Sequence, residues 1–598
     1  MSAREIPSSP GRHVEELAAF AAAKGASHPS DFVARTLPSG MTYYDYVGQP
    51  IEIQEIDKRP YRLIKLINNI EVFLVQDSDY DLATAAMLVK AGYAQDPLNL
   101  PGLAHFCEHM LFINTEKYPE AGGFDSFLSI HNGISNAYTD IDHTCYYFSI
   151  ANAGLEDALD RWSQFFIKPL FDPEYVRREV NAIDSEFKTH INNNAWRLDS
   201  LLSSLANPAH PFSKFGTGNY RTLAERAESL GLCLSTEVVS FYDRYYSSDV
   251  MSLAIIGSQD IQQLTEWAVQ MFSHIPSKGI STKPCSTAPF AQDALGTLVH
   301  FKTVGKKFQL SIVFPLPKIN HLWKSKPLEV IKDLLEFRAG GTLFDFLKQR
   351  GWAYDISCHQ ESDTDDYSFL RFEVNLTEDG YRSYHDVVRS VFSYLETLRQ
   401  HHIPETFFND LRQRRINEFR FEHLDHGTDL SEFLATSFLY SFYPRHLLLS
   451  GLNMIYEYSP TDYHLVLDSL RPSNCFFMLG SQDPGVECPL REEHFGVEYC
   501  LDVIDSAFVV ELEQITPYRE FAIPADNRFV SYDLELVSGI ERPEEPLLEP
   551  TLLLRGKHGE VWHRRDDRFF LPKGKLGIEL KMPRAVRTAP DSELVIST

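Results

Sequence analysis

Residues 102–112 have the sequence G-L-A-H-F-C-E-H-M-L-F, which contains the pattern H-x-x-E-H as His105, Glu108 and His109. Residues four apart lie on one face of an α-helix, so both imidazoles can bind one Zn²⁺ at about 2.0–2.1 Å. Glu108 shares that face and can hold a metal-bound water without being a ligand. This is the inverted order of the zincin motif. The alternative for so short a pattern is a helix with two exposed histidines and a solvated glutamate.

A catalytic zinc needs a third protein ligand and one open position. Residues 172–187 predict a second helix, with Asp172 as its N-cap and an extension to about Leu205. Glu179 and Glu186 are seven residues apart and share one face of that helix. We expect Glu186 to be the third ligand and Glu179 to accept the free N–H of a ligand histidine. The alternative for each acid is a solvated helix surface.

Runs of β-branched and aromatic residues predict strands around the motif helix. L-I-N-N-I-E-V-F predicts a hairpin that turns at Asn68 and Asn69, and residues 135–139 and 144–150 predict two more strands. Asn136 and Ala137 lie on the first of these two. They are expected to hydrogen-bond an extended peptide substrate at the sheet edge, with plain sheet residues as the alternative.

The composition is that of an ordinary globular protein, with 598 residues, 43% hydrophobic and 23% charged. The net charge of −27 argues against nucleic acid and anionic membranes as partners. No run of apolar residues is long enough to span a membrane, and no secretory signal is visible. The eight cysteines form no C-x-x-C pair, which argues against a disulfide framework and favours a cytoplasmic location.

The order of predicted elements repeats along the chain. The sequence P-L-E-V-I-K-D-L-L-E-F falls on the motif helix when the two are aligned without gaps, so the second copy lacks the histidines and is expected to bind no metal. Two unrelated α/β domains remain the alternative. The predicted boundaries are a polar extension over 1–58, a catalytic zinc-binding domain over 59–275, a linker over 276–295, a ligand-free repeat over 296–523, and a linker with the truncated start of a third domain over 524–598.

One loop, H-P-F-S-K-F-G-T-G-N at residues 210–219, carries a G-T-G that weakly resembles a phosphate-binding loop. It lacks G-K-[ST], so a nucleotide site is disfavoured there.

The H-x-x-E-H helix, N-A-Y-T, L-D-R-W-S-Q-F-F, R-R-E-V-N-A-I-D-S-E and H-P-F-S-K-F-G-T-G-N follow one another in the order and spacing of a known family. In these stretches the chain resembles the insulysin/pitrilysin-type zinc metallopeptidases. The resemblance covers residues 60–598 and is strongest in the first domain. It implies an α+β fold of repeated α/β-roll domains, in which helices pack on antiparallel-rich sheets.

The resemblance also implies a function: a zinc-dependent metalloendopeptidase with one Zn²⁺ per chain. It implies His105, His109 and Glu186 as metal ligands, Glu108 as the base and Glu179 as an auxiliary acid. Asn136 and Ala137 match substrate-strand positions. Cys107, between the two ligand histidines, implies sensitivity to thiol modification.

Two departures from the family limit these expectations. The chain stops after about half of the family's four domains, so we expect activity to need a homo-oligomer or a separate C-terminal half-chain. The alternative is a half-protein that retains zinc and binds peptides but is weakly active or inactive. Phe337 and Arg338 replace a histidine and a glutamate of the family's exosite, which puts the anchoring of substrate N-termini in doubt.

Overall fold

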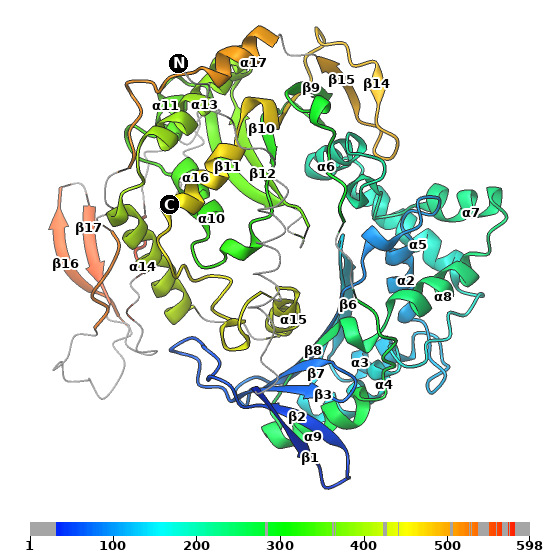
Figure 1. Ribbon diagram of the computed structural model, residues 1–598. Coiled ribbons are helices and arrows are strands. Elements are labelled where there is room, and N and C mark those ends of the chain that lie inside the picture. Colours follow the sequence, from blue (N-terminus) through cyan, green and yellow to red (C-terminus); the bar gives the residue numbers. More distant parts are fainter. Residues whose placement is uncertain are drawn as a thin grey trace, which may run out of the picture. The chain divides into compact units, whose positions relative to one another are not determined.

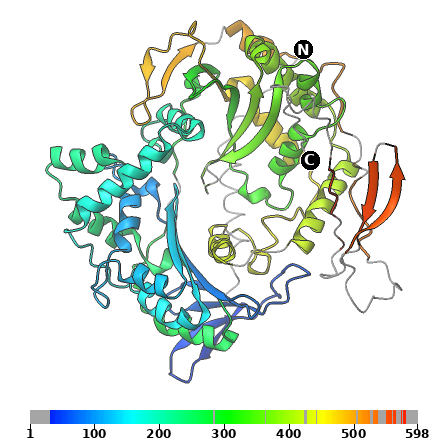
Figure 2. The same ribbon diagram turned by 180° about the vertical axis from the view of Figure 1, so that it is seen from behind.

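The computed structural model describes residues 31–281, 285–361, 364, 366–422, 427–440, 442–502, 506–524, 527, 529–535, 549–557, 559–564, 572 and 575–579. The helix predicted for residues 14–24 lies outside these ranges. The chain divides into two units, Met1–Arg528 and Phe529–Thr598. The first unit contains two large sheets, each with its own helices (Figures 1 and 2).

The first sheet has eight strands in the order β1-β2-β3-β4-β8-β5-β7-β6. All neighbours in it are antiparallel except β4 and β8, which are parallel. The strands are β1 (Phe32–Thr36), β2 (Thr42–Tyr46), β3 (Tyr61–Leu66), β4 (Glu71–Gln76), β5 (Leu82–Val89), β6 (Ile134–Thr139), β7 (Thr144–Ala151) and β8 (Met251–Gly257).

The predicted extension over residues 1–58 is too long, because β1 and β2 extend the first sheet beyond β3. The two strands pair across a turn in which Gly40 has a φ of +86°. Their residues are mostly exposed or half-buried, so they lack the apolar run that marks a buried strand. The hairpin predicted at Asn68 and Asn69 is confirmed, and Asn69 takes the left-handed conformation that the turn requires.

Helices cover one face of this sheet and enclose the main core of the first repeat. The helices of this repeat are α2 (Leu103–Leu111), α3 (Gly123–Ile130), α4 (Leu155–Ser163), α5 (Val176–His190), α6 (Asn194–Ser204), α7 (Arg226–Ser229), α8 (Leu234–Tyr245) and α9 (Ile261–Phe272).

The helix predicted from Asp172 to about Leu205 is in fact two helices. Asp172 accepts a hydrogen bond from the Glu174 N–H and caps a preceding turn, and α5 begins only at Val176. The chain leaves helical geometry at Asn193, whose side chain caps α6. The second helix is therefore free to point away from α5.

The second sheet has seven strands in the order β11-β12-β10-β13-β9-β15-β14. Its strands are β9 (Thr297–Lys302), β10 (Phe308–Pro315), β11 (Ala353–Glu361), β12 (Phe369–Leu376), β13 (Phe476–Ser481), β14 (Leu490–Arg491) and β15 (Glu498–Asp502). Its helices are α10 (Pro327–Glu336), α11 (Leu343–Gln349), α12 (Glu378–Arg382), α13 (Tyr384–Gln400), α14 (Glu405–Phe421), α15 (Thr428–Thr436), α16 (Pro460–Ser469) and α17 (Ser506–Glu513).

Five strands of each sheet follow the same plan. The order β4-β8-β5-β7-β6 in the first sheet matches β9-β13-β10-β12-β11 in the second, and each series has one parallel pair followed by three antiparallel pairs. Helix α2 lies between the third and fifth strands of its series along the chain, as α10 does in the second. The α+β fold with a repeated domain is therefore confirmed.

Each repeat contributes a helix that covers the free face of the other repeat's sheet. Leucines of α6 pack with Val299, Phe301 and Phe369 of the second sheet. Helix α15 follows α13 and α14 along the chain as α6 follows α4 and α5. It packs on the first sheet through Leu430 and Leu434. Figure 1 shows α15 beside β8 and β7, and α6 beside β9. Neither sheet can bury both faces with its own helices, so the two repeats form one packed body.

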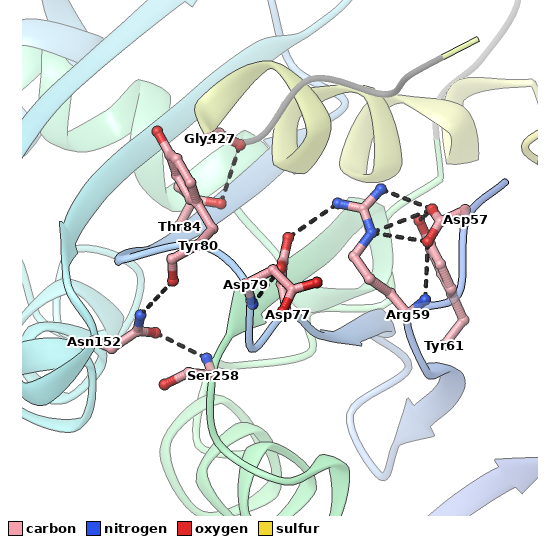
Figure 3. A network of polar contacts seen from close by, with 10 residues as sticks. All are labelled: Asp57, Arg59, Tyr61, Asp77, Asp79, Tyr80, Thr84, Asn152, Ser258 and Gly427. Atoms are coloured by element: carbon pink, nitrogen blue, oxygen red, sulfur yellow. Dashed lines mark hydrogen bonds and ion pairs between the residues drawn. The ribbon is translucent and has the colours of Figure 1, made fainter. Parts of the chain in front are cut away.

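A polar network strengthens the junction around α15 (Figure 3). The Arg59 guanidinium lies between Asp57 and Asp77, at 2.7 and 3.1 Å from their carboxylate oxygens. The Thr84 hydroxyl of β5 donates to the carbonyl of Gly427, immediately before α15. Because Arg59 and both aspartates are largely buried, loss of the cation would remove an ion-pair partner from each carboxylate.

The second unit contains one hairpin among its described residues, β16 (Thr551–Gly556) paired with β17 (Gly559–His563). Among the described residues of the whole chain, no helix is long and apolar enough to cross a membrane. All eight cysteines lie in described segments and are free thiols, as expected from their spacing.

Candidate metal centre

Helix α2 carries the H-x-x-E-H pattern and is anchored at its N-terminus by a buried carboxylate. Asp96 accepts hydrogen bonds from the N–H groups of Gly102 and Ala104 at 2.6 and 2.7 Å. Burial outweighs these bonds and raises the pKa of Asp96 to about 7. Gly102 has a φ of +93°, which a residue with a side chain adopts only under strain. The start of α2 is therefore set by local contacts.

Both histidines point from α2 toward Glu186 on α5. The Nε2 atoms of His105 and His109 lie 3.6 and 3.7 Å from the same oxygen, Glu186 Oε2. Ligands 2.0–2.1 Å from a tetrahedral zinc lie about 3.4 Å from one another. Both measured separations are slightly longer than this, so a small contraction would bring Glu186 to the distance of a shared ligand from each histidine.

The other ring nitrogens are held by groups behind the histidines. His105 Nδ1 lies 2.7 Å from the carbonyl oxygen of Thr217, which can only accept, so this nitrogen carries the proton. His109 Nδ1 lies 3.3 Å from Glu179 Oε2. With both Nδ1 atoms protonated, loss of any proton on the Nε2 atoms leaves lone pairs that face Glu186, as metal binding requires.

The electrostatic shifts at this site reflect the close approach of acids and imidazoles. Burial lowers the pKa of His109, but hydrogen bonds to Glu179 and Glu186 outweigh it and raise that pKa to about 9. The hydrogen bond from His109 lowers the pKa of Glu186. Such stabilisation of a cation between carboxylates is the electrostatic setting that a dication also favours.

Glu108 lies beside the two histidines, and its ligand oxygen falls within 4.8 Å of both ring nitrogens. Glu186 approaches both Nε2 atoms, whereas Glu108 Oε2 is engaged by the Thr139 hydroxyl at 2.6 Å, so the geometry favours Glu186 over Glu108 as the third ligand. Two imidazoles and a carboxylate are a donor set that zinc accepts, so the residues fit this metal.

Strand β6 lies at the end of the first sheet, next to α2. Asn136 is exposed and Ala137 half-buried on this edge strand. The edge presents backbone groups to an incoming chain, and Thr139 of the same strand binds Glu108. The predicted substrate strand and the metal centre are therefore neighbours.

In the second repeat, ion pairs join the helices that are equivalent to α2 and α5. Arg414 and Arg415 of α14 bind Asp333 of α10 at 2.5 and 3.7 Å, and Arg415 also binds Glu329 at 3.2 Å. The described part of this repeat holds no cluster of metal-binding side chains. Salt bridges thus connect α10 and α14 directly, whereas the corresponding helices α2 and α5 carry the candidate metal ligands.

Sequence reasoning missed the residues behind the ligands. Thr139 acts through its hydroxyl and Thr217 through its carbonyl across long sequence separations, whereas the Asp96 carboxylate accepts from N–H groups at the nearby start of α2. The loop at residues 210–219 positions the centre, because Lys214 donates to the carbonyls of Ala94 and Asp96 while Thr217 holds His105. The two glycines of this loop, Gly216 and Gly218, were the only sequence feature that indicated such close packing.

Cys107 is fully buried, and burial raises the pKa of its thiol well above the ordinary value. Its burial argues against the sensitivity to thiol reagents expected from its place between the ligands, since a thiolate must form before it reacts. Cys233 is the exposed thiol, and its pKa is lowered to about 7 by hydrogen bonds from Ser235 and Thr236.

The repeated α+β domains and the H-x-x-E-H helix define the inverted-zincin class of fold. Three family models match the chain in order: Insulinase (Peptidase family M16) over residues 71–209, Peptidase M16 inactive domain over 235–415, and Middle or third domain of peptidase_M16 over 419–596. The chain belongs to the M16 family of insulysin- and pitrilysin-type peptidases.

Relatives and solved structures agree with this assignment. The chain is 34% identical to the insulin-degrading enzyme of Bos taurus over 90% of its own length and 52% of the relative's. It is 32% identical to the A-factor-processing enzyme of Saccharomyces cerevisiae over 88% of the chain and 51% of the relative. The crystal structure of pitrilysin superposes with a TM-score of 0.79 at 25% identity, covering 88% of this chain and 55% of that one. The chain thus spans about half the length of the curated relatives it matches.

Proposed function

We propose that this protein is a zinc-dependent metalloendopeptidase that hydrolyses peptides and small proteins. The observation that carries the proposal is the approach of His105 Nε2 and His109 Nε2 to one oxygen of Glu186, with Glu108 beside them. Zinc, when bound, supplies a Lewis acid that makes a water more acidic and polarises a substrate carbonyl.

The protein's own residues then hold and move protons. Thr139 orients the Glu108 carboxylate through a 2.6 Å hydrogen bond, so one carboxylate oxygen stays free to take the proton of the attacking water. Glu108 returns that proton to the leaving amine, which completes peptide-bond hydrolysis. Thr217 and Glu179 keep the two imidazoles in the tautomer that donates Nε2 lone pairs.

We propose that the substrate binds as an added strand on β6. An extended peptide there would hydrogen-bond the main chain at Asn136 and Ala137. Thr139, which binds Glu108, lies on the same strand. The doubt about N-terminal anchoring of substrate remains at Phe337 and Arg338, where Arg338 is paired with Asp355 at 2.6 Å.

The partner requirement is a second part of the proposal. The relatives are about twice as long, so turnover is expected to need a second copy or a separate C-terminal half-chain. The alternative is a half-protein that retains zinc and binds peptides with little or no turnover. We propose a cytoplasmic location because all eight cysteines are free thiols, and we propose no nucleic-acid partner because the net charge is −27.

Zinc content and cleavage of a quenched peptide, with and without a chelator, test these proposals. One zinc per chain with chelator-sensitive cleavage supports the enzyme, whereas zinc without cleavage supports the peptide-binding alternative. The matched variant is Glu108→Gln, which should keep zinc and lose turnover. Full activity of Glu108→Gln would remove Glu108 as the base, and absence of zinc from the folded wild type would refute the ligand set.

A further inference from the structure

Residues 492–495, in the turn between β14 and β15, belong to the second repeat but pack on Phe187 and Phe215 of the first, beside the candidate metal centre. We call this segment the buttress loop. Figure 1 shows the β14–β15 hairpin, in orange, next to α6 and the end of α5, and Figure 2 shows the same neighbours from behind. None of the roles assigned above to the centre involves this loop.

The loop is held in one conformation by a buried carboxylate. Glu492 accepts hydrogen bonds from the N–H groups of His494 and Phe495 at 2.8 and 2.6 Å. It also accepts one from the Ser200 hydroxyl of α6 at 2.9 Å, and Arg197 of α6 donates to the Phe495 carbonyl at 3.1 Å. The two aromatic side chains at the tip are therefore presented by a fixed turn.

One of these side chains supports the helix that carries the third ligand position. The Phe495 ring packs edge-on against Phe187 with centroids 5.0 Å apart, and both rings are buried. Phe187 immediately follows Glu186 on α5, and the side chain of Glu186 is 46% exposed. Packing on Phe187 therefore restrains a helix whose ligand face is open to solvent.

The other side chain supports the loop behind His105. The His494 ring stacks on Phe215 with centroids 3.8 Å apart and planes 7° from parallel. Phe215 lies two residues before Thr217, whose carbonyl accepts from His105 Nδ1. Phe215 also contacts Phe187 at 5.7 Å, so the two supports meet. The same turn therefore packs against both Phe187 on α5 and Phe215 in the loop that holds His105.

We propose that His494 and Phe495 are positioning residues that set the geometry, and hence the zinc affinity, of the centre in the first repeat. Affinity depends on how well the ligands are held before the metal arrives, and losing a group behind a ligand costs about 10–100-fold in metal affinity. Through this contact the second repeat, which has no metal cluster in its described part, contributes to the metal centre. The inference rests on the proposed zinc site.

The test measures zinc affinity of the full chain by competition with a chelator, and the absorption spectrum of the cobalt-substituted protein. His494→Ala and Phe495→Ala are expected to bind zinc about tenfold more weakly and to change the cobalt spectrum. His494→Phe keeps an aromatic ring that can stack on Phe215 and is expected to retain wild-type zinc affinity. The matched control is Phe521→Ala, which removes an equally buried ring from a stack with Tyr518 in the second repeat.

Each outcome decides between positioning and simple packing. If the two loop variants match Phe521→Ala in zinc affinity and spectrum, and lose only stability, the proposal is overturned. If Phe495→Ala does not fold, Phe495→Leu gives the same comparison with a smaller change in volume. If the wild type binds no zinc, the proposed function itself fails, which is a different result from wild-type binding with unaffected variants.

Discussion

Gly102→Ala tests how closely the start of α2 and the loop behind His105 are coupled. Gly102 has a φ of +93°, and an added Cβ would lie 2.4 Å from the Cα of Gly218. The backbone conformation costs about 1–2 kcal/mol for a residue with a side chain. The Cβ contact is about 1 Å shorter than ordinary van der Waals contact, and relieving such overpacking costs about 1–3 kcal/mol.

The summed loss in the free energy of unfolding is about 2–5 kcal/mol. The more specific consequence concerns zinc. A shift of Gly218 by about 1 Å would carry the neighbouring Thr217 carbonyl away from His105 Nδ1, and a 2.7 Å hydrogen bond lengthened that far is no longer one. We therefore expect Gly102→Ala to weaken zinc binding by about 10–100-fold.

The matched control is Gly122→Ala. Gly122 also precedes a helix and has a φ of +68°, but an added Cβ there would meet nothing within 4 Å. It should show the backbone cost without any loss of zinc affinity. Urea unfolding and chelator competition on both variants give the comparison. Equal stability loss and unchanged zinc binding in both variants would refute the coupling through Gly218.

Three further outcomes are expected. Burial raises the pKa of Asp96 to about 7, so its protonation favours the folded state, and the free energy of unfolding should fall as the pH rises from about 4 to about 7. Asp96→Asn should flatten that dependence in unfolding titrations, and an unchanged slope would contradict the assignment. Iodoacetamide should label Cys233 before Cys107, which peptide mapping by mass spectrometry would show, and zinc content should survive the first labelling. Thr139→Val should reduce kcat about tenfold or more with zinc content unchanged, since a hydrogen bond to a charged group contributes about 1.5–3 kcal/mol; loss of zinc together with activity would instead make Thr139 a structural residue.

Local patterns in the sequence were sufficient for much of the fold. The turn at Asn69, the helix over the H-x-x-E-H pattern and the strand over residues 144–150 follow from residue preferences within a few positions. The repeat was visible for the same reason, because both copies place their elements in the same order. Where local preference was weak the predictions failed: β1 and β2 lack an apolar run, and α5 ends at His190 before Asn193 caps a separate helix.

The sequence by itself determined which residues of α2 can bind a metal, because a spacing of four fixes their common face on a helix. Only the tertiary structure decided that Glu186 approaches both Nε2 atoms, and that Thr217, Thr139 and the buttress loop stand behind the site. Those contacts join residues far apart in the chain, many of them through backbone carbonyls or aromatic faces. Their geometry arises from how α5, the loop at 210–219 and the second repeat pack together, which no local pattern records.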